Sequence, residues 1–512
     1  MSKKATEKKT KIIKDMVHDY ITVSRFYLKL IDTEHFQRLR FIRQLTCQYV
    51  YPAANHTRFE HSLGVFHLSR KYISKLKDQL KALGVEYNDY INMKLNLSIA
   101  ALLHDVGHAP MSHLGEHYYS KKEIIRYLKA ICTDKDINSD IFDIKGCGAS
   151  HELMSCYIIL QYYYDLIVEN VHKHKVDFEL ICRMIIGVEY KTEDKWFEDL
   201  AIRVLNSDTI DMDKLDYIIR DSYMTGVSVP SIDVHRLFSC FYIMPTTKKV
   251  VVKNQAITVV QNIIDARDCL YMLVCNHHIA VYTDFVFEFY MKHLMLMEDK
   301  GKQTTTRDSM KANEFFSCEA IGKKLVTDND LMSKLKEYYV NKSNTSEYTK
   351  VISPQIFARE FLKPLWKNLY EFKLFMDNSI IDSNAKDDLL EKMCSAKTYI
   401  YRSYVAKEII RRLNLKNGEV FIVPRPNKFY MDNKKNKFYI LVGKNLKEIS
   451  ELLPQKKYGS IHSDVAFYVF APKALTKEVN QEFIKIARDG IPSEDKIRKM
   501  EGYIESIPKW MQ

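Results

Sequence analysis

His104 and Asp105 are the residues whose types and spacing point most clearly to chemistry. They are adjacent, they follow an apolar stretch at helical spacing, and they precede a glycine and a proline that end a helix. An imidazole nitrogen and a carboxylate oxygen form a mixed donor set that suits a divalent transition metal. Such a site needs further ligands, and His61 and Asp213 are the candidates. The sequence therefore predicts a metal site built from these residues.

His61 stands at the start of a predicted helix. The apolar residues Val65, Leu68 and Tyr72 follow it at close to the helical period, which puts His61 near the face that packs on the core. Taken alone, a histidine in that place is more often a hydrogen-bonded core residue than a metal ligand. Its assignment as a ligand depends on the rest of the set.

Asp213, Tyr217 and Asp221 recur at a spacing of four residues, which places them on one face of a helix. We expect residues 206–208 to supply the N-cap of this helix and Gly226 to end it. A solvated helix face is the alternative interpretation of such a polar stripe.

The composition predicts a globular and mainly helical protein. The chain of 512 residues is long enough for more than one compact unit, and its apolar fraction of 46% argues for packed cores. Only 15 glycines are present, which argues against an all-β protein rich in tight turns. The fold class that we expect is mainly α, with small β-hairpins and an α+β region towards the C-terminus.

The net charge of +12 at pH 7 favours polyanionic partners, either nucleotides or nucleic acid. A soluble enzyme with a lysine-rich surface explains the charge equally well. Lysine clusters such as Lys434–Lys435 lack the interleaved aromatic residues that grooves for single strands use. We therefore expect single-stranded nucleic acid to be a weak partner.

The ten cysteines stand singly, without a C-x-x-C pair, so neither a zinc ribbon nor a disulfide framework is predicted. The lysine-rich stretch Met1–Lys14 has no apolar segment of the secretory kind. No apolar run reaches the ~20 residues that a membrane span needs. These features predict a reduced, cytoplasmic protein with no membrane partner.

Changes in pattern along the chain predict four regions. The third region begins with the polar stretch Gly301–Thr306, and the last region contains strand-like segments at Val420–Val423, Phe438–Val442 and Val465–Phe470. The predicted regions are a basic tail with a short extended segment (1–24), a helical core with a hairpin around Pro245 (25–300), a helical accessory region (301–399) and an α+β region (400–512).

Motifs that occur in a fixed order extend the argument. They are Arg58–Ser62, His104–His113, Ser150–Glu152 and Asp211–Asp221. Their order resembles the HD superfamily and, within it, the deoxynucleoside-triphosphate (dNTP) triphosphohydrolases. The resemblance implies that residues 25–300 form an HD-domain catalytic core.

The resemblance also implies roles for the site residues. It implies that His61, His104, Asp105 and Asp213 hold iron, manganese or zinc, with Mg²⁺ accompanying the substrate phosphates. It implies proton transfer by His113, His151 and Glu116, although Glu116 stands where a relative has aspartate. The alternative for the two histidines is support of a metal ligand.

The substrate residues are implied in the same way. The resemblance implies that Arg58, Lys214 and Tyr217 contact the substrate phosphates and that Arg267 approaches the γ-phosphate end. A sugar contact falls to Asp221, while Gln44 and Leu45 would crowd a 2′-hydroxyl. Ordinary salt bridging is the alternative for the charged members. Cys275 and Tyr271 depart from the family pattern at the sugar, which weakens the expectation of deoxyribose selectivity.

A second nucleotide site is implied at Lys11, Asp32, Gln37 and Arg40, which match residues that read an activating guanine nucleotide in relatives. A structural salt bridge is the alternative for these residues. Relatives also imply a homo-oligomer, either a dimer or a tetramer.

The expected function is hydrolysis of a dNTP to a deoxynucleoside and triphosphate, through water attack at the α-phosphorus. Other interpretations remain open. One is an HD phosphohydrolase acting on another phosphate ester, such as a nucleoside monophosphate, a cyclic nucleotide or single-stranded nucleic acid. Another is a regulator that binds nucleotides or nucleic acid without turnover.

Overall fold

The computed structural model describes residues 10–144, 146–207, 209–296, 312–341, 347–379, 383–394, 399–425, 439–443, 445–452 and 465–500. The polar stretch Gly301–Thr306, Asp208 and Lys434–Lys435 lie outside these ranges. The chain divides into a first unit and a second unit. The first comprises Met1–Leu270, Ala312–Leu331 and Asn433–Gln455; the second comprises Tyr271–Lys311, Met332–Asp432 and Lys456–Gln512.

The first unit begins with an antiparallel hairpin. Strands β1 (Thr10–Asp15) and β2 (Asp19–Ser24) pair in register from Thr10 opposite Ser24 to Asp15 opposite Asp19. This hairpin stands where the sequence predicts a short extended segment. Helices α1 (Arg25–Ile31) and α2 (Glu34–Arg38) follow.

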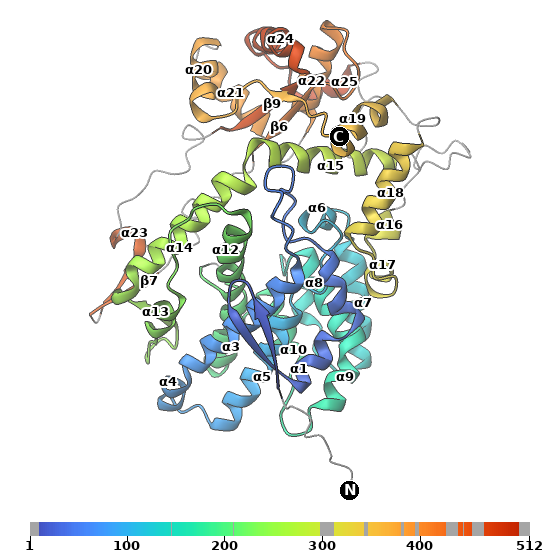
Figure 1. Ribbon diagram of the computed structural model, residues 1–512. Helices are drawn as coiled ribbons and strands as arrows, with labels where there is room; N and C mark the ends of the chain where they lie inside the picture. The colour runs from blue at the N-terminus through green and yellow to red at the C-terminus, as the bar shows by residue number, and fades with distance from the viewer. Residues whose placement is uncertain are drawn as a thin grey trace. The chain divides into compact units, whose positions relative to one another are not determined.

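Long helices form the core of the first unit. Helix α3 (Arg58–Lys75) packs against α5 (Tyr87–Leu103) and α12 (Met212–Thr225), and α5 packs against α10 (Phe178–Ile186) (Figure 1). Helix α3 begins at Arg58 because the Glu60 carboxylate accepts a hydrogen bond from the backbone N–H of Thr57, at 3.0 Å. This cap fixes the start of the helix that carries His61.

Shorter helices surround this core. They are α4 (Lys77–Ala82), α6 (His113–Glu116), α7 (Lys121–Asp134), α8 (Ser150–Ile158), α9 (Tyr164–Asn170), α11 (Trp196–Leu205), α13 (Val234–Ser239), α14 (Ile257–Leu270), α16 (Ala312–Phe315) and α17 (Cys318–Gly322). A π-helical turn, Ile159–Tyr163, joins α8 to α9. The predicted mainly helical fold class is confirmed, and Figure 1 shows it directly.

The predicted hairpin around Pro245 is present as β3 (Phe241–Ile243) and β4 (Val250–Lys253). Strand β7 (Tyr439–Val442) lies parallel to β4, and β8 (Asn445–Glu448) pairs with β7. The sequence predicts β7 as part of a C-terminal α+β region, whereas it extends a sheet of the first unit. Burial of Ile440 opposite Val252 favours this long-range pairing.

The second unit is itself α+β. A three-stranded sheet in the order β5–β9–β6 is formed by Lys363–Pro364, Phe467–Ala471 and Phe421–Pro424, respectively. Trp366 packs edge-on against Phe467, with ring centres 5.4 Å apart. Its helices are α15 (His278–Leu296), α19 (Glu347–Phe357), α20 (Leu369–Ser379), α21 (Ser383–Cys394), α22 (Ile400–Arg412), α24 (Thr476–Asp489) and α25 (Glu494–Lys499). Helix α18 (Asp328–Val340) starts in the first unit and continues in the second, and the short α23 (Ile449–Leu452) belongs to the first.

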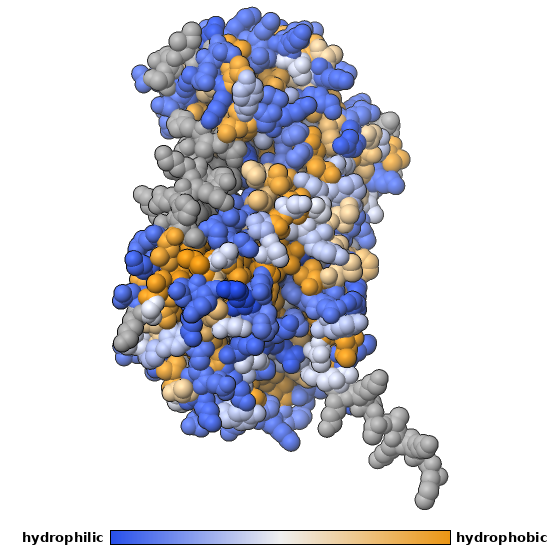
Figure 2. Space-filling model, turned by 60° about the vertical axis from the view of Figure 1, so that its left-hand side comes forward, coloured by the Kyte–Doolittle hydropathy of each residue, from blue (hydrophilic) through white to orange (hydrophobic). Residues whose placement is uncertain are grey.

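On the face drawn in Figure 2, hydrophilic side chains cover most of the described area and hydrophobic ones gather in smaller groups. Within the described residues, none of the helices combines the length and the apolar character that a membrane span requires.

Candidate active site

The structure brings the predicted metal ligands together from three helices. His61 lies in the first turns of α3, His104 and Asp105 follow the end of α5, and Asp213 lies in the first turn of α12. The donor atoms of His61, His104 and Asp105 lie within 4.8 Å of one another. Asp213 Oδ1 lies 2.9 Å from His61 Nε2 and 3.9 Å from His104 Nε2.

These residues fit a divalent metal ion. The Nε2 atoms of His61 and His104 are buried and make no hydrogen bond within the described residues, although buried polar atoms are ordinarily paired. Both nitrogens face the carboxylates of Asp105 and Asp213. Imidazole nitrogens combined with carboxylate oxygens are the donors that zinc, manganese and non-haem iron accept in proteins.

A further carboxylate orients His61. Asp216 Oδ2 lies 2.8 Å from His61 Nδ1, and Asp216 also receives hydrogen bonds from His18 Nε2 at 2.6 Å and Arg220 Nε at 2.8 Å. With Nδ1 donating to Asp216, the lone pair of Nε2 faces the ligand cluster. Burial opposes protonation of His61, but Asp213 and Asp216 outweigh it and raise its pKa to about 10. The surrounding field therefore favours a positive charge at this place.

Asp105 is held in its ionised form. Arg58 Nη1 donates to Asp105 Oδ2 at 2.8 Å, and His108 Nε2 lies 3.2 Å from Asp105 Oδ1. Burial opposes ionisation, but Arg58, His104 and His108 outweigh it and hold the pKa of Asp105 well below its usual value. An ionised carboxylate is the form that binds a metal.

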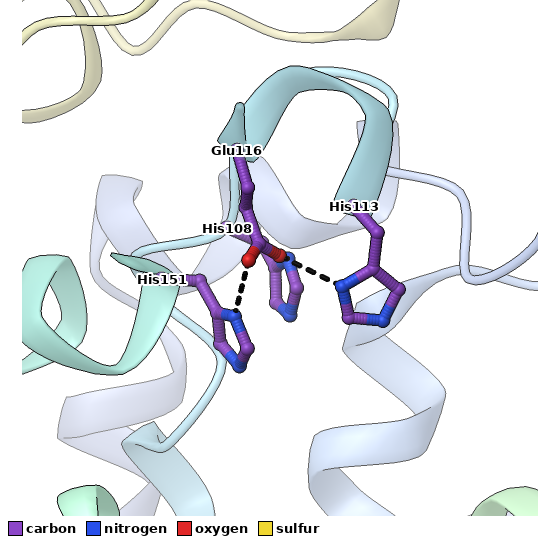
Figure 3. A group of neighbouring side chains, drawn as sticks. All are labelled: His108, His113, Glu116 and His151. Carbon is purple, nitrogen blue, oxygen red and sulfur yellow. Dashed lines mark hydrogen bonds and ion pairs between the residues drawn. The ribbon is translucent and has the colours of Figure 1, made fainter. Parts of the chain in front are cut away.

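A second group of side chains, which we call the Glu116 cluster, consists of His108, His113, Glu116 and His151 (Figure 3). Glu116 Oε1 lies 2.9 Å from His113 Nδ1 and 3.2 Å from His108 Nδ1, and Oε2 lies 2.9 Å from His151 Nδ1. Burial opposes ionisation of Glu116, but the three histidines outweigh it and lower its pKa. The predicted residues His113, Glu116 and His151 are thus neighbours.

His108 and His151 are stacked rings with opposite protonation preferences. Their ring centres lie 4.0 Å apart, with planes inclined by 16°. Burial, together with Arg58 and His151, lowers the pKa of His108 to about 4. Burial also opposes protonation of His151, but the Glu116 carboxylate outweighs it and raises the pKa of His151. Paired titratable groups whose pKa values are pushed apart are typical of acid–base chemistry.

The turn that leads into α6 adopts an unusual backbone. Met111 and Ser112 have φ angles of 59° and 50°, the left-handed region that residues with side chains rarely occupy. Ser112 Oγ accepts a hydrogen bond from Arg58 Nε at 3.0 Å and donates one to the backbone oxygen of Arg43 at 2.6 Å. This turn therefore links Arg58 to the chain segment that carries His113.

Lys214 lies beside the metal ligands but already has protein partners. Its Nζ donates to the backbone oxygen of Ser207 at 2.6 Å and pairs with the carboxylate of Asp211. Asp211 is also the N-cap of α12, because its side chain accepts from the Lys214 backbone N–H at 2.7 Å. The expectation that residues 206–208 supply this cap is wrong: Asp211 stands directly before the helix. Gly226 ends α12 in a left-handed conformation, as expected.

The predicted sugar contacts Asp221 and Gln44 are linked to each other through His56. Asp221 Oδ1 pairs with His56 Nε2 at 2.8 Å in a buried contact, and the buried Oε1 of Gln44 makes no hydrogen bond within the described residues. The backbone N–H of Gln44 donates to the His56 oxygen at 3.1 Å, which ties these residues together. Leu45 follows directly, and its backbone oxygen accepts from Gln48 Nε2 at 2.7 Å.

Tyr217 lies one helical turn after Asp213 on α12, and Arg267 lies on α14, which packs against α12. Burial and the positive charge of Arg267 oppose protonation of Lys214, but Asp211 and Asp213 outweigh them and raise the pKa of Lys214. Lys214 and Arg267 thus lie on two helices that pack together, and Arg58 lies at the start of α3, which also packs against α12. Arg58 and Lys214 also form salt bridges with Asp105 and Asp211, as the alternative interpretation expects.

The predicted second nucleotide site is only partly assembled. Gln37 Nε2 donates to the backbone oxygen of Ile31, beside Asp32, and Gln37 Oε1 accepts from Arg40 Nε at 2.8 Å. The Arg40 guanidinium lies 3.5 Å from the centre of the Phe59 ring. Lys11 is exposed on a separate element, β1, opposite Val23.

The fold adds side chains to the candidate site that the sequence did not predict there: His108, Asp216 and His18. His108 stands inside the quoted motif, so its position between His104 and His113 was an available signal. Asp216 lies one turn after Asp213 on the same helix. His18 gave no local signal, because 198 residues separate it from its partner Asp216.

The part of the chain that carries the candidate site matches a known protein family. Residues 58–218 match the HD domain family. A deoxynucleoside triphosphate triphosphohydrolase SAMHD1 homolog of Dictyostelium discoideum is 29% identical over 283 residues, 55% of this chain and 49% of that protein. The uncharacterized protein YwfO of Bacillus subtilis is 30% identical over 294 residues, 57% of each chain. The chain spans about half the length of the SAMHD1 homolog and of an uncharacterized protein of Methanocaldococcus jannaschii.

Solved structures share the fold. A phosphohydrolase from Bacteroides thetaiotaomicron superposes with a TM-score of 0.61 at 20% identity, covering 90% of this chain and 99% of that one. A hypothetical protein from Aquifex aeolicus superposes with a TM-score of 0.60 at 23% identity, covering 92% and 99%.

Proposed function

Because this chain is an HD-domain protein with distant homology to SAMHD1-type enzymes, we propose that it is a metal-dependent dNTP triphosphohydrolase. The reaction is cleavage of a dNTP to a deoxynucleoside and triphosphate. One observation carries the proposal: a metal-fitting set of two histidines and two aspartates lies beside a histidine–glutamate cluster that can move protons. The names of the related enzymes supply the substrate class.

The metal site would be formed by His61, His104, Asp105 and Asp213, holding iron, manganese or zinc. An ion there supplies Lewis acidity and lowers the pKa of a bound water. Asp216 keeps His61 in the tautomer that offers Nε2, and Arg58 keeps Asp105 ionised. Mg²⁺ would accompany the substrate phosphates.

The residues of the Glu116 cluster would transfer the protons of the reaction. We expect His151 to be the proton donor, because Glu116 raises its pKa and so favours its protonated form. His108 lies between Asp105 and Glu116, and its lowered pKa keeps it neutral. His113 has a side chain 71% exposed, so it can exchange protons with solvent. His151 or His113 would protonate the leaving oxygen while water attacks the α-phosphorus.

Substrate binding falls to the residues around α12. Arg58 and Lys214 would contact phosphate oxygens while they stay beside Asp105 and Asp211, and Tyr217 lies on the same helix as Lys214. Arg267 would meet the γ-phosphate end. Asp221 would contact the sugar, and the Oε1 of Gln44, with Leu45 beside it, would act at its 2′-position.

Regulation and assembly form part of the proposal. A second nucleotide would bind at Lys11, Asp32, Gln37 and Arg40, and the protein would act as a dimer or tetramer in the cytoplasm.

Product analysis tests the proposal. The purified protein is incubated with each dNTP and rNTP, singly and mixed, and the products are resolved by ion-exchange chromatography. Release of intact triphosphate from dNTPs supports the proposal, and activity restricted to mixtures supports the second nucleotide site. Cleavage of a nucleoside monophosphate, a cyclic nucleotide or a single strand instead would indicate a different phosphate ester. Salt-dependent binding to single strands without hydrolysis would indicate a regulator.

A further inference from the structure

A segment outside the HD-family match is hydrogen-bonded to the backbone next to the Glu116 cluster. It comprises helices α16 and α17 and the first turn of α18, and α17 packs against α8 (Figure 1). The buried Arg38 side chain bridges the two parts. Its Nε donates to the Val326 oxygen and its Nη2 to the His108 oxygen, each at 2.7 Å. The segment therefore borders the Glu116 cluster.

Asp328 is the residue of this segment that reaches the catalytic turn. Its Oδ1 accepts from the Met111 backbone N–H at 2.7 Å, and its Oδ2 accepts from the Arg43 backbone N–H at 3.0 Å. Asp328 is only 7% exposed. A buried carboxylate is costly unless it is fully hydrogen-bonded, so both of these contacts matter to its placement.

The two contacts act on one structural feature. Met111 and Ser112 occupy the left-handed region, with Ser112 at φ 50° and ψ −124°. Such a backbone persists only when its surroundings hold it. The Ser112 hydroxyl accepts a hydrogen bond from Arg58 and donates one to the backbone oxygen of Arg43. The residue that follows Ser112 is His113.

Local helix capping does not account for Asp328. At the start of α18, the Asp330 carboxylate accepts from the Thr327 backbone N–H at 2.8 Å and from the Thr327 hydroxyl at 2.6 Å. Asp330 therefore caps the helix, whereas Asp328 accepts a hydrogen bond from Met111, a residue 217 positions earlier in the chain.

We propose that Asp328 is a positioning residue for the active site, contributed from outside the HD-family match. It holds the left-handed turn at Met111 and Ser112 and so sets where His113 and Arg58 stand. The assignment of their chemistry rests on the proposed function, but the positioning itself does not.

The test compares Asp328→Asn with the matched control Asp330→Asn. The amide introduced by Asp328→Asn has one acceptor oxygen in place of two, so it cannot accept from both backbone N–H groups in the present geometry. The kcat should therefore fall about 10- to 100-fold. Bound metal should stay at the wild-type level, because the metal ligands keep their contacts. Asp330→Asn should keep the wild-type kcat.

A rescue variant separates positioning from general damage. Glycine adopts a φ near 59° without strain, so the Met111→Gly/Asp328→Asn double variant should recover kcat relative to Asp328→Asn. Met111→Gly alone serves as its reference. Rescue is expected even though Met111→Gly removes a buried side chain.

Amide hydrogen exchange supplies a readout that needs no turnover. Asp328→Asn should speed exchange in a peptide spanning residues 106–116, and Asp330→Asn should not. Unchanged exchange and unchanged kcat in a folded Asp328→Asn protein would overturn the inference, as would equal losses in both variants or loss of metal with kcat. A wild-type protein without turnover would overturn the proposed function alone, because exchange still reports on Asp328.

Discussion

Asp216 Oδ2 lies 2.8 Å from Nδ1 of His61, so a carboxylate outside the metal-fitting set orients one of its histidines. Asp216 is fully buried and ionised. Burial opposes this ionisation, but Arg220, His18 and His61 outweigh it and hold the pKa of Asp216 well below its usual value. Partners of this kind fix the tautomer and direction of a metal-binding imidazole.

Asp216→Asn should therefore lower metal affinity about 10- to 100-fold, because the amide no longer favours the required tautomer. Metal titration followed by calorimetry measures the change. Asp233→Asn is the control, since the exposed Asp233 caps helix α13, where its side chain accepts from the Arg236 backbone N–H. Wild-type affinity in a folded Asp216→Asn protein would contradict the role given to this carboxylate.

His18 extends the same network into the N-terminal hairpin. Its Nε2 lies 2.6 Å from Asp216 Oδ1, while Arg220 Nη1 reaches Asp15 at 2.9 Å. His18→Ala should weaken metal binding less than Asp216→Asn does, because Arg220 continues to hold the carboxylate. A metal affinity equal to that of the wild type would show that the hairpin has no influence on the site.

Local motifs and long-range contacts differ in how far the sequence predicts them. His104 and Asp105 directly follow the apolar helix α5, which ends at Leu103, so their place at one site can be inferred from the residues around them. The contact of Asp328 with Met111 joins positions 217 residues apart, and nothing near either residue indicates it. The same holds for β7, whose pairing with β4 depends on tertiary packing.

Glu116→Gln should lower kcat about 100-fold while bound metal is retained, because the carboxylate organises the proton-transferring histidines. Burial opposes protonation of His151, and Glu116 outweighs it, so removing the charge lowers the pKa of His151. An acid is lost as pH rises through its pKa. The alkaline fall of kcat should therefore move to lower pH in this variant, and a profile that stays in place would exclude His151 as the acid.

His67 should make the protein less stable in acid. Burial, followed by the charges of Lys71 and His18, lowers the pKa of His67 from 6.5 to about 4. Below pH 6.5, His67 binds a proton in the unfolded chain but stays neutral in the folded protein. The free energy of unfolding therefore falls as the pH drops towards 4. The slope is at most about 1.4 kcal/mol per pH unit, reduced by partial exposure of the ring.

Urea unfolding of wild-type protein and His67→Asn between pH 7 and pH 4 measures this effect. The difference in unfolding free energy between the two proteins should shift in favour of the variant as the pH falls. A difference that is constant with pH would show that His67 titrates normally in the folded state.

The most direct test of the central claim measures bound metal and triphosphate release together, in wild-type protein and in Asp213→Ala. Asp213 lies 2.9 Å from His61 Nε2, so its loss should remove bound metal and hydrolysis of mixed dNTPs at once. Asp233→Asn should retain both. Full turnover by a folded Asp213→Ala protein would contradict metal-dependent hydrolysis at this site.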